Sequence, residues 1–219
     1  MCWARMSHDS AGHVGALGSW RAMLFVVAGV VFAGDLTVLL YNLAVGTESQ
    51  YLTLGQGLIG TAWACSFLAL LGFYPKLSER GKWLPRIGSL FAGIGVLTMV
   101  VMAVVSFGLA AGVVPGTLEE YTPLFLPGVF LGIVFGFGLY GVATLRTAVY
   151  SQRVGALFLV LVATFLTNLG TGIAGYNPLV KIVGVVAVLV LANLILGYTV
   201  RTGGADVTAT GGTSPDSAA

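Results

Sequence analysis

One acidic residue, Asp35, stands alone in a long apolar stretch of the sequence. Between Arg21 and Glu48 no other acidic or basic side chain occurs. If this stretch crosses a membrane, an acid near its centre costs about 2.5–3.5 kcal/mol, whereas each apolar residue returns only about 0.3–0.6 kcal/mol. The low dielectric favours the neutral, protonated acid. Such a carboxyl can carry a proton, bind a cation or donate a hydrogen bond between helices, and the sequence leaves these alternatives open.

Other polar residues at a similar depth are the predicted partners of Asp35. With a rise of 1.5 Å per residue, Asp35 and Asn168 both lie about 20 Å from the inner ends of their helices. Thr98 falls near the same layer, and Thr164 precedes Asn168 by one helical turn on the same face. We therefore predict an intramembrane polar cluster of these four residues. It serves either helix packing alone or a function, since intramembrane acids commonly mark functional sites.

Several other chemistries lack the residues that they require. A haem bound within a helical bundle needs intramembrane histidines, but His8 and His13 both precede the first apolar stretch. Neither H-E-x-x-H nor G-x-S-x-G occurs, and a lone acid cannot hold Mg²⁺ with substrate phosphates. A G-x-G-x-x-G match at Gly136, Gly138 and Gly141 has no preceding strand and indicates helix packing. We expect no enzymatic activity, no cofactor and no metal.

The composition is typical of a membrane protein. Charged residues make up 8% and hydrophobic residues 57% of the 219, whereas roughly a quarter of a soluble domain is charged. This excludes a soluble globule, a disordered chain and a nucleic-acid binder. A helix needs about 20 mostly apolar residues to cross the hydrocarbon core. Six stretches qualify, at 22–45, 55–74, 87–111, 127–145, 154–172 and 179–200. Because none alternates with the period of barrel strands, we predict an all-α, polytopic transmembrane bundle of six helices.

The basic residues predict the orientation of this bundle. Nine of the ten Lys and Arg side chains fall in the first 21 residues, in the second and fourth connections or after the last span, and Lys181 is the exception. The positive-inside rule makes that side cytoplasmic. Residues 1–21, which begin at either Met1 or Met6, and 201–219 are then cytoplasmic tails. The second tail is predicted to be disordered because its composition cannot bury apolar surface. We expect a multi-pass protein of the cell membrane.

Two connections between the spans carry most of the remaining charge. The segment 75–86 is expected to contact anionic lipid headgroups, at about 1 kcal/mol per charge, or to act as a topological signal alone. Its basic residues are Lys76, Arg80, Lys82 and Arg86. The segment 112–126 contains the Glu119–Glu120 pair. We expect this segment to be a linker, with a cap over a cavity as the alternative.

Small residues predict how the helices pack. In lipid, close approach of helices depends on small side chains and on polar contacts across the interface. Gly128, Gly132 and Gly136 recur every four residues on one face of the fourth span. An Asn also lies one turn before a Gly in three places, Asn42–Gly46, Asn168–Gly172 and Asn193–Gly197. We predict that these glycines admit a neighbouring helix and that the Asn side chains hydrogen-bond across the contact.

The sequence supports two classes of function. In the first, the protein transports a small solute or an ion, with Asp35 as the protonatable or cation-binding group. In the second, it is a non-transporting membrane subunit or scaffold that packs through its glycine faces against a membrane protein partner or a second copy of itself. A water-accessible cavity around Asp35 would favour transport. A dry contact of Asp35 with Asn168 or a threonine would favour packing.

Overall fold

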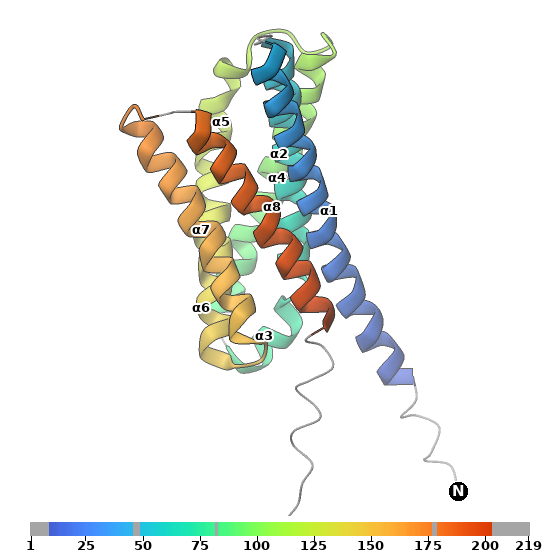
Figure 1. Cartoon of the computed structure of the whole chain (residues 1–219). Coiled ribbons are helices and arrows are strands. Elements are labelled where there is room, and N and C mark those ends of the chain that lie inside the picture. The colour runs from blue at the N-terminus through green and yellow to red at the C-terminus, as the bar shows by residue number, and fades with distance from the viewer. Residues whose placement is uncertain (1–8, 46–48, 82, 177–178, 203–219) are drawn as a thin grey trace, which may run out of the picture.

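In the computed structural model, the described residues are 9–45, 49–81, 83–176 and 179–202. Six of the helices that they form are long and apolar enough to cross a membrane, which confirms the six predicted spans (Figure 1). The fourth span joins three segments, and a short α3 lies outside the spans. The elements are α1 (Asp9–Val45), α2 (Ser49–Leu71), α3 (Tyr74–Arg80), α4 (Leu84–Ala110), α5 (Leu118–Phe130), the π-helix η1 (Leu131–Phe137), α6 (Gly138–Thr147), α7 (Gln152–Ile173) and α8 (Leu179–Thr202).

The largest difference from the predicted boundaries lies in the fourth span. We predicted that it starts at residue 127, but α5 begins at Leu118, so much of the expected linker is helix. Pro123 and Pro127 lie inside α5. Because proline usually ends a helix or kinks it, the sequence does not indicate that the helix extends back to Leu118. At the N-terminus, α1 begins at Asp9, within the predicted tail. The predicted disordered tail lies outside the described residues from position 203 on.

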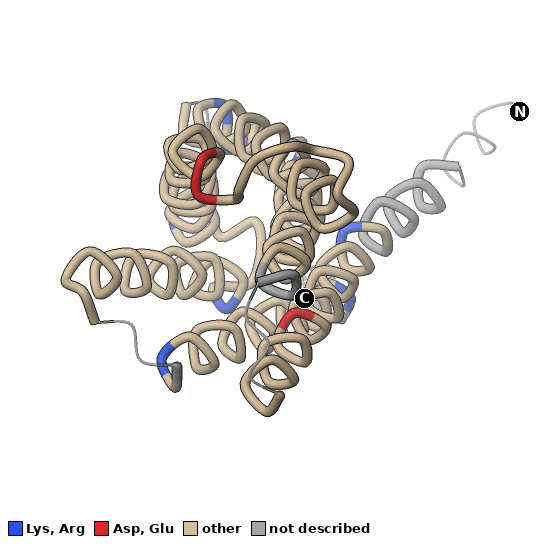
Figure 2. Tube along the Cα trace, turned by 90° about the horizontal axis from the view of Figure 1, so that it is seen from above, with Lys and Arg blue, Asp and Glu red and all other residues tan. Residues whose placement is uncertain are grey.

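The spans form a closed ring in chain order. Helix α1 packs against α2, α2 against α4, and α4 against the joined segments α5, η1 and α6. Both η1 and α6 pack against α7, α7 packs against α8, and α8 returns to α1. Figure 2 shows this arrangement along the axis of the bundle. Each span therefore has two neighbours in the ring and one face toward its centre.

Charged side chains mark the two ends of the ring. Glu119 and Glu120 lie in the first turn of α5, at what we call the acidic end (Figure 2). The opposite end, the basic end, holds α3 and the ends of α6 and α8. Its exposed basic residues are Lys76, Arg80, Arg86, Arg146, Arg153 and Arg201, whereas Lys82 lies outside the described residues. Which end faces the cytoplasm stays a prediction.

Glycines bring the fourth span close to α4. A Cβ added to Gly132 would lie 2.7 Å from the Cα of Gly95, and one at Gly136 would lie 3.3 Å from the backbone of Ala92. A Cβ at Gly128 would overlap the side chain of Thr98. The glycine face recognised in the sequence therefore lies against α4, where backbone approaches backbone.

We expect Gly132→Ala to lower the free energy of unfolding by about 1–3 kcal/mol, because the added methyl group must displace the α4 backbone. The measurement is denaturant unfolding in mixed micelles. Gly138→Ala is the matched control in the same span, since no atom lies within 4 Å of its added Cβ. Equal stability of the two variants would contradict the close approach of the helices.

Candidate functional site

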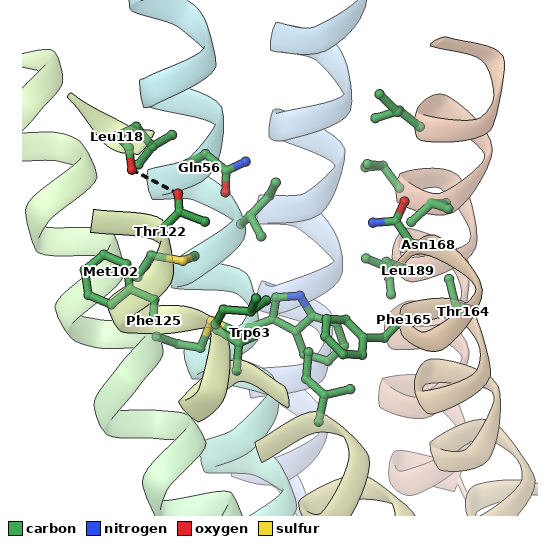
Figure 3. A pocket seen from close by; sticks show the side chains of 18 residues that line it. Gln56, Trp63, Met102, Leu118, Thr122, Phe125, Thr164, Phe165, Asn168 and Leu189 are labelled. Carbon is green, nitrogen blue, oxygen red and sulfur yellow. Dashed lines mark hydrogen bonds between the residues drawn. The ribbon is translucent and has the colours of Figure 1, made fainter. Parts of the chain in front are cut away.

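A cavity of about 520 Å³ lies inside the ring (Figure 3). Its walls come from α2, α4, α5, η1, α7 and α8, and it reaches the first turns of α5 and α8 at the acidic end. Four of its lining residues are polar: Gln56, Thr122, Thr164 and Asn168. The other lining residues are Ile59, Trp63, Met99, Met102, Leu118, Phe125, Leu126, Val129, Ile133, Phe165, Ile182, Val185, Val186 and Leu189. None of the described lining residues is charged.

The polar groups of the cavity have hydrogen-bonding capacity that the described residues do not use. The hydroxyl of Thr122 donates to the carbonyl of Leu118 at 2.9 Å, and that of Thr164 donates to its own helix at 2.8 Å. Their oxygens can still accept a hydrogen bond. In the described part of the chain, the side-chain amides of Gln56 and Asn168 make no hydrogen bond. These two amides offer both donors and acceptors to a bound molecule.

A column of aromatic rings continues from the floor of the cavity toward the basic end. Trp63, which is 4% exposed, lies 5.7 Å from Phe137 between ring centroids. Phe137 lies 5.7 Å from Phe158, Phe158 lies 5.4 Å from Phe73, and Phe73 lies 4.8 Å from Tyr150. The three phenylalanines are fully buried. The ring of helices therefore encloses a cavity in its acidic half and packed aromatic side chains in its basic half.

Arg21 closes the basic end of this column. Its Nη1 donates to the carbonyl of Gly72 at 3.0 Å and to the hydroxyl of Tyr150 at 2.9 Å, and its guanidinium carbon lies 5.0 Å from the ring centroid of Phe73. Burial raises the pKa of the Tyr150 phenol, Arg21 lowers it in part, and Glu79 raises it. The net shift is upward, so the phenol stays neutral around pH 7 and accepts the hydrogen bond. We call these contacts the Arg21 clamp.

Sequence reasoning missed the Arg21 clamp. It placed Arg21 in a cytoplasmic tail, but the side chain is only 7% exposed. An arginine at a cytoplasmic helix end already satisfies the positive-inside rule, so its type and position suggested no second role. The sequence also carried no signal for its partner Tyr150, because a tyrosine at a helix end is expected as an interfacial anchor.

Asp35 is buried but does not line the cavity. The carboxyl is 5% exposed, and its Oδ1 would lie 2.8 Å from a Cβ at Gly55, so it faces the contact between α1 and α2. Within the described part of the chain no hydrogen bond or ion pair to Asp35 is present. Gly55 precedes the cavity-lining Gln56 along α2. The carboxyl therefore lies against a different face of α2 from the one that forms the cavity wall.

The structure does not bring the four residues of the predicted polar cluster together. Asp35 lies between α1 and α2, Thr98 lies against Gly128 between α4 and α5, and only Thr164 and Asn168 share a site, the cavity. The prediction rested on equal depth in the membrane. Depth does not give the order of the helices, and α8 separates α1 from α7 in the ring.

The three asparagines that precede glycines have three different environments. Asn193 forms an interhelical contact, since the Ser66 hydroxyl donates to its Oδ1 at 2.8 Å, and its own amide donates to the Leu189 carbonyl at 2.9 Å. The Oδ1 of Asn42 is buried without a partner among the described residues. Asn168 lines the cavity instead of a helix contact. The repeated pattern therefore does not indicate one repeated contact.

No protein-family model matches this chain, and neither a curated protein nor a solved structure gives a significant match. Its function is therefore inferred from the cavity and the residues around it.

Proposed function

We propose that the protein is a membrane carrier for a small uncharged solute, which binds in the cavity at the acidic end. The observation that supports this role is the contrast within one ring of six spans, where the acidic half holds a cavity and the basic half is filled. A carrier requires a binding site that opens to one side while the path to the other side is closed, and a second conformation in which this is reversed.

The chemistry of the cavity wall supports an uncharged solute. The described polar side-chain groups of the wall are amides, hydroxyls and the indole N–H of Trp63, and none of them is charged. A charge moved out of water into such a site, with no opposite charge beside it, is strongly disfavoured. This preference favours an uncharged solute over an ionised one.

Two buried hydroxyls support a second conformation. The Tyr140 hydroxyl and Thr144 Oγ1 lie one turn apart on α6, in the basic half, and neither has a hydrogen-bond partner in the described part of the chain. Unpaired buried polar groups are rare and call for an explanation. In our proposal they gain water or solute as partners when the Arg21 clamp opens and the aromatic column separates.

The positive-inside rule gives the direction. With the basic end in the cytoplasm, the cavity of this conformation opens to the outside of the cell membrane. Lys76, Arg80 and Arg86 are exposed at that end, where they would contact the anionic headgroups of the cytoplasmic leaflet.

Counterflow in liposomes tests the carrier role. Vesicles with the protein are loaded with unlabelled N-acetylphenylalaninamide, an uncharged aromatic amide, and a trace of the labelled compound is added outside. Exchange through a carrier makes the label rise above its equilibrium level before it falls, whereas passive leakage does not. Vesicles without protein are the control. Binding without this overshoot would contradict a carrier and favour the alternative, a non-transporting subunit or scaffold.

Asp35 is our proposed site of proton coupling, because it is an acid buried at the α1–α2 contact with no ion pair in the described structure. We expect an imposed pH gradient to drive accumulation of the labelled amide in the wild type, and Asp35→Asn to abolish this accumulation. Solute binding should be unchanged, since Asp35 is not in the cavity wall. Gradient-driven uptake that survives in Asp35→Asn, together with lower thermal stability, would instead assign Asp35 to helix packing.

A further inference from the structure

We infer that the solute is an amphiphile with a flat, ring-containing apolar body and one uncharged, hydrogen-bonding end, and that it enters the cavity body first. The body lies against Trp63 and Phe165, and the polar end lies between Gln56 and Asn168. This inference takes the cavity as the solute site of the proposed carrier and names the chemical class that the site selects.

The order of side chains along the cavity carries this inference. Gln56, Thr122 and Asn168 lie nearer the acidic end, whereas Trp63 and Phe125 lie deeper (Figure 3). A molecule that enters body first therefore places its apolar part on aromatic rings and keeps its polar end beside the amides. The opposite orientation would move the polar end away from the Gln56 and Asn168 amides to the level of Trp63 and Phe125, where aromatic rings replace most of the hydrogen-bonding groups, which is costly.

The floor of the cavity favours a ring over a flexible chain. Trp63 and Phe165 offer aromatic surfaces from opposite walls, α2 and α7, and ring pairs gain energy beyond their buried area. Met99 and Met102 complete the α4 wall, and methionine adapts its shape and contacts aromatic edges favourably. The volume of about 520 Å³ suits a single drug-sized molecule.

The charged groups nearest the cavity do not provide a counter-ion within it. Lys181 lies one residue before the lining Ile182, and its Nζ donates to the backbone carbonyls of Asn168 at 3.3 Å and Tyr176 at 3.1 Å. Glu119 and Glu120 follow the lining Leu118 but are exposed. An ionised solute would thus meet only uncharged groups among the described residues that line the cavity.

A matched set of probes tests this class by binding alone. N-phenyl-1-naphthylamine is uncharged with one N–H donor, its 8-sulfonate is anionic, and 1-benzylnaphthalene keeps the shape without the donor. Binding is measured by energy transfer from Trp63 to the bound naphthylamine. The protein for this measurement is a variant in which Trp3, Trp20 and Trp83 are replaced by Phe, so that Trp63 is its one tryptophan. We expect saturable binding of the naphthylamine and at least tenfold weaker binding of the sulfonate. We expect 1-benzylnaphthalene to displace the naphthylamine only at concentrations well above the dissociation constant of the naphthylamine.

A pair of variants on α7 locates the polar end. Asn168→Leu should weaken naphthylamine binding about three- to tenfold, because one hydrogen bond is lost. The affinity of this variant for naphthylamine should then be close to the affinity of the wild type for 1-benzylnaphthalene. Thr167→Val, at the exposed neighbouring position, should bind as the wild type. If Asn168→Leu does not fold, Gln56→Met makes the same test from α2.

Three results would overturn the inferred class: no saturable binding, equal affinity for the sulfonate, or wild-type affinity in both amide variants. None of these readouts requires transport. Selective binding without counterflow would therefore contradict the carrier and leave the ligand class standing. Counterflow of the N-acetylphenylalanine anion as fast as that of its amide would contradict the class and leave the carrier standing.

Discussion

Val185→Trp should abolish binding of the uncharged probes and the counterflow that depends on it. Val185 lines the cavity from α8, so an indole at this position occupies the space that the solute body needs. We expect naphthylamine affinity to fall at least a hundredfold, because the loss comes from exclusion rather than from one missing contact. The first measurement is the fluorescence of bound naphthylamine under direct excitation, which does not depend on energy transfer from Trp63. The second is counterflow of N-acetylphenylalaninamide.

Val188→Trp is the matched control for this variant. Val188 lies on the same helix but is exposed on the surface of the bundle, where an added indole meets lipid. This variant should bind and exchange as the wild type does. If both variants keep binding, the probes bind elsewhere on the protein and the cavity is not the solute site.

Arg21→Met should release the basic end of the bundle. The substitution keeps much of the apolar stem but leaves the Gly72 carbonyl and the Tyr150 hydroxyl without their charged donor. Hydrogen bonds to charged groups contribute about 1.5–3 kcal/mol each. Since water can replace part of these contacts at the end of the bundle, we expect the free energy of unfolding to fall by about 3 kcal/mol in denaturant titrations in mixed micelles.

Arg21→Met should also make the buried basic half of the bundle more accessible to water-soluble reagents. In a background with Cys2→Ser and Cys65→Ala, a cysteine at Thr144, which is fully buried, should react slowly with a water-soluble thiol reagent. It should react much faster when Arg21→Met is added. Arg153→Met, at an exposed arginine of the same end, is the control and should change neither rate nor stability. Slow labelling in all three proteins would show that Arg21 does not hold the basic end closed.

The six spans could be predicted because each requires about 20 apolar residues, a signal that needs no knowledge of neighbours. The glycine face of the fourth span was visible for the same reason, since Gly128, Gly132 and Gly136 repeat at helical spacing. The start of that span was placed too late, because Glu119, Glu120 and Pro123 interrupt the apolar pattern at the beginning of α5 although the backbone there is already helical. Local patterns were sufficient where the structure depends on one helix at a time.

The candidate site could not be predicted from local patterns. Asp35 attracted attention as the lone acid, yet its contact with Gly55 depends on how α1 and α2 rotate against each other. The aromatic column was invisible because each helix is apolar on every face, so Phe137 or Phe158 does not stand out from its neighbours. Asn168 was identified as polar and intramembrane, but the cavity that it lines exists only because five other elements form the remaining walls.

The most direct test is the accessibility of single cysteines from each side of the membrane. Cysteines at Thr122 and Asn168 in the cavity wall, and at Thr144 in the basic half, are placed separately in the cysteine-free protein and reconstituted in one orientation. A membrane-impermeant thiol reagent should label Thr122→Cys and Asn168→Cys from the acidic end only, N-phenyl-1-naphthylamine should protect both, and Thr144→Cys should stay unlabelled without solute. Labelling of the two cavity positions from the basic end, or no labelling from either end, would contradict a solute cavity that opens at the acidic end.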